Sequence, residues 1–281
     1  MTAHATKGSV HFGPRLIGSP TGRLRGALMV APSANIERAT PLPGEPGVVY
    51  SRALEQHAVL RKTLQFYGVE TVVLDFRGED AYESSVADAA FAFEDGAMIM
   101  RSTAMARRAE ADRAEVEFAR LDIPLAGHIV APGLLDGSDV MAAGKTVFVG
   151  VGNRGNDLGR GGFAQVARAH GYDVAEVRLA PGVPALRAVA GAVSKDTILL
   201  AADKVDPAPF ARFRTIVLER GEEFAAGLLC LDDGHVIADI RFRTALKTLR
   251  RAGIAVDALD LYDFYKAGIT PSMLVLPLKR D

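Results

Sequence analysis

Residues 146–180, TVFVGVGNRGNDLGRGGFAQVARAHGYDVAEVRLA, place a helix-like segment between two short apolar runs. TVFVGV (146–151) and VAEVRLA (174–180) are rich in Val and are bounded by Gly or polar residues, which is typical of buried strands. The intervening segment predicts a helix over 161–171, preceded by a glycine-rich loop. This order of strand, helix and strand indicates an α/β fold.

The same alternation extends in both directions, from about residue 25 to the end of the chain. Helix centres recur about every 40–55 residues, and each unit reads as strand, strand, helix, strand, so that about five units fit. Asp233–Gly234 predicts a tight hairpin, because Gly supplies a positive φ. The further predicted strands are 27–32, 71–76, 97–102, 127–132, 197–202, 215–220, 227–232, 236–240, 256–261 and 273–278, and the further helices 48–67, 104–121, about 206–213 and 241–252.

The domain organisation follows from the absence of any Pro-, Ser- or Gly-rich linker after residue 25. We expect a single domain over 25–281 and an N-terminal arm over 1–24. The arm is rich in Gly, Ser, Thr and Arg and lacks the apolar core of a secretory signal. It is therefore expected to pack loosely.

Composition excludes several classes of protein. The chain has 281 residues, 33 Lys+Arg against 34 Asp+Glu, and 49% apolar residues, which is typical of a soluble globular protein. A formal net charge of -1 argues against a nucleic-acid partner, and no apolar stretch is long enough to span a membrane. The single cysteine, Cys230, excludes an intramolecular disulfide and fits a cytoplasmic location.

The glycine-rich loop GVGNRG (150–155) matches G-x-G-x-x-G, the spacing of a dinucleotide-binding turn. In a dinucleotide-binding fold this motif leads directly into a helix, whereas the helix here is predicted to start several residues after it. We therefore favour a strand-to-helix loop whose glycines take positive φ. The six histidines show no metal-ligand spacing, and Cys230 lies in an apolar strand, so we expect neither a metal nor a cofactor.

Five charged residues are candidates for a site. Asp88 lies between apolar residues, where a carboxylate is costly unless paired. Asp136 and Asp139 form a close acidic pair that could hold a cationic ligand or cap a turn, and capping is favoured. Arg107, at a helix start, and Arg154, in the glycine-rich loop, could bind a carboxylate through their planar guanidiniums.

Four ordered pieces then resemble one family, from about residue 25 onwards: SRALEQHAVLRKTLQFYGVETVVL, SSVADAAFAFEDGAMIMRSTAMARRAE, DGSDVMAAGKTVFVGVGNRGNDLG and KAGITPSMLVLPLKRD. Together they are similar to the dimethylarginine dimethylaminohydrolases, in the guanidine-modifying (pentein) superfamily. The resemblance implies a five-fold pseudosymmetric α/β propeller of ββαβ units around a central channel, and a homodimer. It also implies a channel site in which a cysteine attacks the guanidinium carbon, a histidine transfers protons, carboxylates hold the guanidinium and arginines bind the substrate carboxylate.

The chain departs from that pattern at the reactive positions. Met273, in SMLVLPL, stands where the family has its cysteine, and a one-residue shift to Ser272 would put every Leu out of phase. Ala185 stands where the family has its histidine, and the family's Glu-Asp pair reads Ala87-Asp88. Asp88, Arg107, Arg154 and Asp136 remain, the last replacing a Glu.

A thioether cannot become a thiolate, and alanine cannot transfer a proton. We therefore expect a protein that binds a small arginine-like or amino-acid-like ligand through Asp88, Arg107, Arg154 and Met273, without thiol chemistry. The alternative is a Cys-independent hydrolase or lyase that acts on a small C–N compound with Asp88 or Asp136 as catalytic base. A third hypothesis is a scaffold that binds only other proteins.

Overall fold

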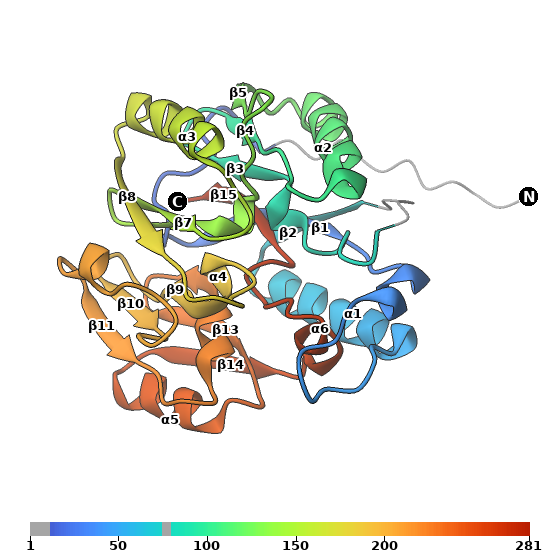
Figure 1. Cartoon of the computed structure of the whole chain (residues 1–281), viewed down its shortest axis with the longest axis vertical. Helices are drawn as coiled ribbons and strands as arrows, with labels where there is room; N and C mark the ends of the chain where they lie inside the picture. The colour runs from blue at the N-terminus through green and yellow to red at the C-terminus, as the bar shows by residue number, and fades with distance from the viewer. Residues whose placement is uncertain (1–11, 75–79) are drawn as a thin grey trace, which may run out of the picture.

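The computed structural model describes residues 12–74 and 80–281, which form a mixed α/β fold of small sheets (Figure 1). The strands of this part form five three-stranded sheets. In each sheet the middle strand pairs antiparallel with one neighbour and parallel with the other. The sheets are β15 (Leu276–Arg280), β1 (Leu24–Val30) and β2 (Glu70–Leu74); β3 (Ala90–Ala92), β4 (Ala97–Ile99) and β5 (Leu125–His128); β6 (Val140–Ala143), β7 (Thr146–Val151) and β8 (Asp173–Arg178); β9 (Ala190–Ala192), β10 (Thr197–Leu200) and β11 (Arg214–Val217); and β12 (Leu229–Asp232), β13 (His235–Asp239) and β14 (Ala255–Leu259).

Helices make the crossovers that parallel pairs require. Each of the four longer helices follows the middle strand of a sheet and leads to its parallel partner, whereas only a short 3-10 turn lies between β10 and β11. Figure 1 shows these four helices toward the outside, with β15 passing through the middle. The helices are α1 (Tyr50–Phe66), α2 (Arg108–Arg120), α3 (Asp157–Ala169) and α5 (Arg243–Arg251), with the shorter α4 (Leu186–Val189) and α6 (Tyr262–Lys266) and the 3-10 turns η1 (Ala34–Arg38), η2 (Val86–Asp88), η3 (Met105–Arg107), η4 (Gly137–Asp139), η5 (Ala208–Phe210) and η6 (Glu223–Gly227).

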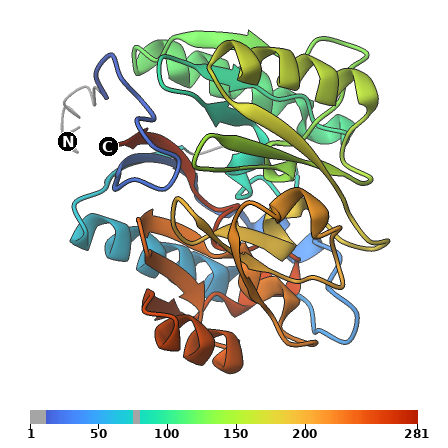
Figure 2. The ribbon, with the colours of Figure 1, turned by 90° about the vertical axis from the view of Figure 1, so that its left-hand side faces the viewer.

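The last strand lies beside the first. Leu24 pairs with Arg280, and Leu28 pairs with Leu276, so β15 and β1 join the two ends of the described chain in one sheet. Figure 2 shows this pair as the dark-red strand next to the blue one. The first strands of the five units, β3, β6, β9, β12 and β15, all contribute residues to one cavity.

Most predicted elements are present, within a few residues of their expected ends. β7 has the predicted bounds, and the hairpin at Asp233–Gly234 joins β12 to β13 with Gly234 at φ 81°. The helix predicted over 161–171 begins earlier, at Asp157, because the Asn156 side chain caps it by accepting the Gly159 N–H at 2.9 Å. β15 begins at Leu276, so Met273 lies in the turn before this strand, and not within it.

The expectation of a loosely packed arm is corrected for residues 12–23. Phe12, Leu16 and Ile17 are buried in a core cluster with β1 and β15. Leu16 also donates its N–H to the Glu94 carbonyl at 2.6 Å and accepts the Arg280 N–H at 2.8 Å. The apolar side chains are spaced too irregularly to predict this packing from the sequence. His4 and His11 lie outside the described residues.

Four glycines of the segment 150–162 are needed for close packing, which corrects the expectation of positive φ. Gly150, Gly152, Gly155 and Gly159 are absent from the positive-φ residues of the described chain. A Cβ on Gly159 would instead lie 2.1 Å from the Leu134 carbonyl, and one on Gly150 would lie 2.9 Å from Asp139 Oδ1. These glycines therefore bring the loop and α3 against the segment that carries the acidic residues.

Candidate functional site

Two 3-10 turns bring the candidate carboxylates together, because a glycine allows them to touch. Gly137, in η4, packs so closely on η2 that an added Cβ would lie 2.0 Å from the Ala87 carbonyl. This contact places Ser138 against Asp88, at the end of η2. Arg107 comes from η3, before α2, and Arg154 from the loop between β7 and α3. The structure thus brings Asp88, Arg107, Arg154 and Asp136 into one cluster.

Replacing Gly137 with alanine is expected to lower the free energy of unfolding by about 1–3 kcal/mol, because a backbone carbonyl cannot move away as a flexible side chain can. Urea unfolding measures this change. Gly161→Ala is the matched control: its Cβ meets nothing within 4 Å in α3, so it is expected to stabilise by about 0.5–1 kcal/mol. Equal effects at both sites would contradict the close contact between η2 and η4.

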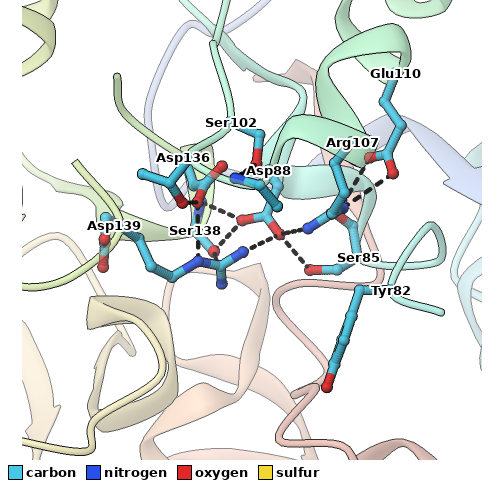
Figure 3. A network of polar contacts seen from close by, with 12 residues as sticks. Tyr82, Ser85, Asp88, Ser102, Arg107, Glu110, Asp136, Ser138 and Asp139 are labelled. Atoms are coloured by element: carbon cyan, nitrogen blue, oxygen red, sulfur yellow. Dashed lines mark hydrogen bonds and ion pairs between the residues drawn. The ribbon is translucent and has the colours of Figure 1, made fainter. Parts of the chain in front are cut away.

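Asp88 is the centre of the cluster and is 2% exposed. Its Oδ2 accepts from Arg107 Nη1 at 2.5 Å, from Arg154 Nη2 at 2.8 Å and from the Ser85 hydroxyl at 3.1 Å. Its Oδ1 accepts both the backbone N–H, at 3.2 Å, and the hydroxyl of Ser138. Figure 3 shows Asp88 between Arg107 and Ser138. The carboxylate therefore has two cationic partners and a full set of hydrogen bonds.

Arg107 is buried, and its guanidinium is occupied by partners from the chain itself. Besides Asp88, it donates to both oxygens of Glu110, at 2.9 and 2.7 Å, and to the Ser85 carbonyl at 3.2 Å. Asp80 lies further away, with its Oδ1 3.7 Å from Arg107 Nε. Glu110 lies on the far side of Arg107 from Asp88 (Figure 3). The Arg107 guanidinium therefore forms ion pairs with Asp88 of η2 and Glu110 of α2, because a buried charge is costly unless it is paired.

Arg154 differs from Arg107 because a quarter (25%) of its side chain is exposed. Its Nε donates to Asp136 Oδ2 at 2.9 Å, its Nη1 to the Ser138 hydroxyl at 3.2 Å and its Nη2 to Asp88. Asp136 is fully buried, and its Oδ2 also accepts the Thr103 hydroxyl at 3.1 Å. Within the described residues, Asp136 Oδ1 has no hydrogen-bond partner. The cluster therefore contains one partly exposed cation, Arg154, beside one buried and unsatisfied acceptor, Asp136 Oδ1.

Burial and neighbouring charge set the protonation of the cluster. Burial alone would raise the pKa of Asp88, but the Arg154 and Arg107 guanidiniums and the Ser138 hydrogen bond hold it well below its usual range. Burial, with the Asp88 charge added, raises the pKa of Asp136. Burial likewise raises the pKa of Glu110. Asp88 is therefore a fixed anion and a weak proton acceptor, whereas Asp136 holds a proton more readily.

Asp139 lies to one side of this network (Figure 3). Its Oδ1 accepts the Leu186 N–H at 2.8 Å, at the start of α4, so it binds the backbone of a distant segment and not that of its own turn. Burial raises the pKa of Asp139 to about 7. The acidic pair therefore divides its roles: Asp136 binds Arg154, and Asp139 binds backbone and can titrate near neutral pH.

Met273 and Ala185 lie in the main apolar core. Met273 is 2% exposed and Ala185 is fully buried, and both belong to one cluster with Leu186, Val189 and Leu274. The Met273 carbonyl accepts the Ala87 N–H at 3.1 Å, so the backbone at Met273 adjoins the residue before Asp88. Neither side chain carries a group that ionises.

Cys230 and the described histidines lie outside the cluster. Burial raises the pKa of the Cys230 thiol to about 11, so it stays protonated at neutral pH. His128, His170 and His235 each face a carboxylate of their own, at 3.1, 2.8 and 2.6 Å. His57 is buried in α1. Over residues 12–74 and 80–281, no group of three or more His, Cys, Asp or Glu side chains is placed to hold a metal ion.

Sequence reasoning missed Glu110, Ser85 and Ser138 as members of the cluster. Glu110 was detectable, because a carboxylate three residues after an arginine lies on the same face of a helix. Ser85 and Ser138 carry no such signal, since their roles depend on the contact between η2 and η4. In the described part of the chain, no helix has both the length and the apolar character that a membrane span requires.

The chain is similar to dimethylarginine dimethylaminohydrolases in sequence and in fold. It is 26% identical to the Pseudomonas aeruginosa enzyme over 219 residues, covering 77% of this chain and 85% of the relative. The Streptomyces coelicolor enzyme is 37% identical over 112 residues, or 40% of this chain and 43% of the relative. No family model matches the chain.

Solved structures with the same fold include the following two. A cysteine-to-serine mutant of the Pseudomonas aeruginosa enzyme, in complex with citrulline, superposes with a TM-score of 0.82 at 24% identity, covering 90% of this chain and 99% of the other. The N-terminal domain of a cyanobacterial arginine dihydrolase, bound to its substrate, superposes with a TM-score of 0.79 at 18% identity, covering 91% and 98%. Both structures contain arginine-like or citrulline-like ligands.

Proposed function

This chain is a dimethylarginine dimethylaminohydrolase-like member of the pentein superfamily, and we propose that it binds a small arginine-like or amino-acid-like ligand without thiol chemistry. Its relatives are arginine-modifying hydrolases. The five sheets with one strand order, and the five first strands along one cavity, support a five-fold pseudosymmetric propeller around a central channel. The ligand site is the cluster around Asp88, next to the turns that precede β3 and β6.

The observation that carries this proposal is the partial exposure of Arg154 in a cluster whose other members are largely buried. Asp88, Asp136 and Arg107 are 3% exposed or less. A ligand carboxylate can reach Arg154 and form the charge-assisted hydrogen bonds that a guanidinium fork favours. The Oδ1 of Asp136, beside Arg154, is buried without a hydrogen-bond partner, and it becomes an acceptor for the ligand's ammonium or guanidinium group once the ligand displaces the residues that cover it. An amino-acid-like zwitterion matches both groups.

The absence of thiol chemistry is supported by the two positions that the family uses for it. A covalent step needs a nucleophile with an adjacent base, and Met273 and Ala185 supply neither. Cys230 does not replace the missing thiol, because burial keeps it protonated and it has no hydrogen bond to a histidine within the described residues. The chain keeps charged groups for binding, and it lacks the groups that would cleave a guanidine.

Binding is tested by calorimetry of the whole protein with arginine, dimethylarginine, citrulline and other amino acids. Arg154→Gln is expected to weaken binding at least about tenfold, because a charge-assisted hydrogen bond contributes about 1.5–3 kcal/mol. Arg154→Lys should retain part of the affinity, because it keeps the charge and loses the fork. Arg212→Gln is the matched control, since that side chain is 83% exposed and pairs with Asp173, which is not part of the cluster.

The same mixtures are read by mass spectrometry for citrulline and released amines. We expect ligand binding and no product. Product formation by the wild-type protein would overturn the claim that thiol chemistry is absent. Unchanged affinity in Arg154→Gln would overturn the assignment of the site.

One observation favours a second candidate, a Cys-independent hydrolase or lyase. Asp139 has a pKa of about 7, which suits a general base at neutral pH. Among the carboxylates of the site it fits this role better than Asp88, which is held ionised. Turnover that disappears in Asp139→Asn, while ligand affinity is kept, would select this function over pure binding.

A further inference from the structure

A second polar site lies in the cavity among the first strands of the five sheets. The cavity has a volume of about 100 Å³, several times what one water molecule needs. It opens among β3, β6, β9, β12 and β15, and none of the charged residues of the Asp88 cluster lines it. Among the described residues that line it, Arg187 and Arg280 are cationic and none is acidic.

Arg280 is rigidly held at the wall of this cavity. It is 4% exposed, and its Nη1 and Nη2 donate to the carbonyls of Gly22 and Cys230, both at 2.7 Å. Both acceptors are neutral. Burial lowers the pKa of Arg280, and the more distant Asp232 carboxylate offsets this shift only in part.

The guanidinium of Arg187, on α4, has fewer partners than that of Arg280. Its backbone carbonyl accepts the Ser272 hydroxyl at 3.3 Å, but its guanidinium has no hydrogen bond or ion pair within the part of the chain that the structure describes. Burial lowers its pKa to about 10, with Asp88 opposing this shift and the Arg280 charge adding to it. Two cations thus line one cavity that no acidic residue lines among the described residues, an unfavourable arrangement unless an anion enters.

We propose that this cavity binds a small oxyanion, a carboxylate or a phosphate, through the guanidiniums of Arg187 and Arg280. The planar fork of arginine suits both groups. Apolar side chains, among them Ala90, Ala192 and Leu228, form much of the rest of the wall and can pack against a short apolar body. This site is separate from the proposed ligand site at Asp88.

Thermal unfolding and calorimetry of the full chain test the proposal, with inorganic phosphate, acetate and pyruvate as probes and neutral acetamide as the uncharged control. We expect at least one anion to raise the Tm of the wild-type protein, and acetamide to leave it unchanged. Arg187→Met should lose at least about tenfold in anion affinity. A response to phosphate alone or to carboxylates alone supports the proposal and identifies the source of the oxyanion.

Two further measurements distinguish this site from the Asp88 cluster and from a purely structural role of Arg187. Arg154→Gln should keep the anion response, whereas loss of the response there would place the anion in the Asp88 cluster and overturn the proposal. Without anion, Arg187→Met should be at least as stable as wild type, because removing a half-buried charge that has no ion-pair partner among the described residues is neutral or stabilising. A large loss of stability would indicate the structural role and would also overturn the proposal.

Cys230 supplies an independent readout, because the only cysteine of the chain lines the cavity. A bound anion should slow modification of this thiol by an uncharged maleimide in the wild-type protein, and leave the rate unchanged in Arg187→Met. If the anion still raises the Tm of Arg187→Met, or still slows modification of its Cys230, the result would contradict the site.

Discussion

Replacing Asp88 with asparagine is expected to lower the free energy of unfolding by about 3–5 kcal/mol, the cost of removing one partner from a buried ion pair. The variant leaves the guanidiniums of Arg107 and Arg154 without the carboxylate that they share, at 2.5 and 2.8 Å. Arg107 keeps Glu110, and Arg154 keeps Asp136, which places the loss within this range and not beyond it. Denaturant unfolding near neutral pH measures the change.

The dependence of this effect on pH provides a second check. The pKa of Asp88 is lowered in the folded protein, so its contribution is present above the pKa of about 3.9 that aspartate has in an unfolded chain. The contribution is lost as the pH falls through the folded pKa. The difference between wild type and Asp88→Asn should therefore be constant from about pH 5 to 8 and shrink below about pH 4.

The control for this variant is Asp112→Asn, on the exposed face of α2, which should change stability by less than about 0.5 kcal/mol. If Asp88→Asn loses as little stability as Asp112→Asn, the two buried guanidiniums do not need the Asp88 carboxylate as a partner. Because the folded state needs Asp88, a loss of ligand binding in this variant would not by itself identify a binding residue. Arg154 is the better choice for the binding test.

Asp139→Asn is expected to have the opposite effect and to raise stability at pH 8 by up to about 4 kcal/mol. The folded pKa of about 7 lies about three units above that of an unfolded aspartate, and each unit corresponds to about 1.36 kcal/mol. Between about pH 4 and 7 the folded state keeps a proton that the unfolded state has released, so wild-type stability falls as the pH rises. Asparagine cannot ionise and removes this fall.

The two proteins should therefore be equally stable near pH 4 and diverge up to about pH 7. The amide oxygen of the substituted side chain can still accept the Leu186 N–H, so the backbone contact that Asp139 makes at 2.8 Å is kept. Burial also raises the pKa of Asp239 to about 6, so the stability of both proteins still falls slightly as the pH rises. Asp112→Asn again serves as the control. Lower stability of Asp139→Asn at pH 8 would show that the ionised carboxylate has a favourable partner.

Few groups of the Asp88 cluster are free to bind or to react with a ligand. Asp88 is neutralised by two arginines of the same chain, and Arg107 is fully occupied by Asp88, Glu110 and Ser85. Of the two expected carboxylate-binding arginines, only Arg154 can be approached. Binding by the cluster therefore depends on Arg154 exchanging one internal contact for a ligand.

Much of the architecture could be predicted from the sequence, because long amphipathic helices and Val-rich strands carry a periodic signal. α1, α2, α5 and β7 were predicted close to their observed bounds. β3, β6 and β9 were not, because they are three or four residues long and rich in Ala and Gly. Such strands exist because neighbouring elements enclose them, and propensity alone does not indicate them.

The sequence by itself determined the α/β class, the approximate number of units and the identity of the charged residues that could form a site. Through the family resemblance it also predicted that Met273 and Ala185 occupy the two positions of the family's reactive groups. Only the tertiary structure decided that Arg107 and Arg154 share Asp88, that Asp139 titrates near neutral pH and that Arg187 lines a cavity that no acidic residue lines among the described residues. Pairing and burial of charges depend on contacts between distant segments, such as Gly137 on Ala87, and no local pattern encodes those contacts.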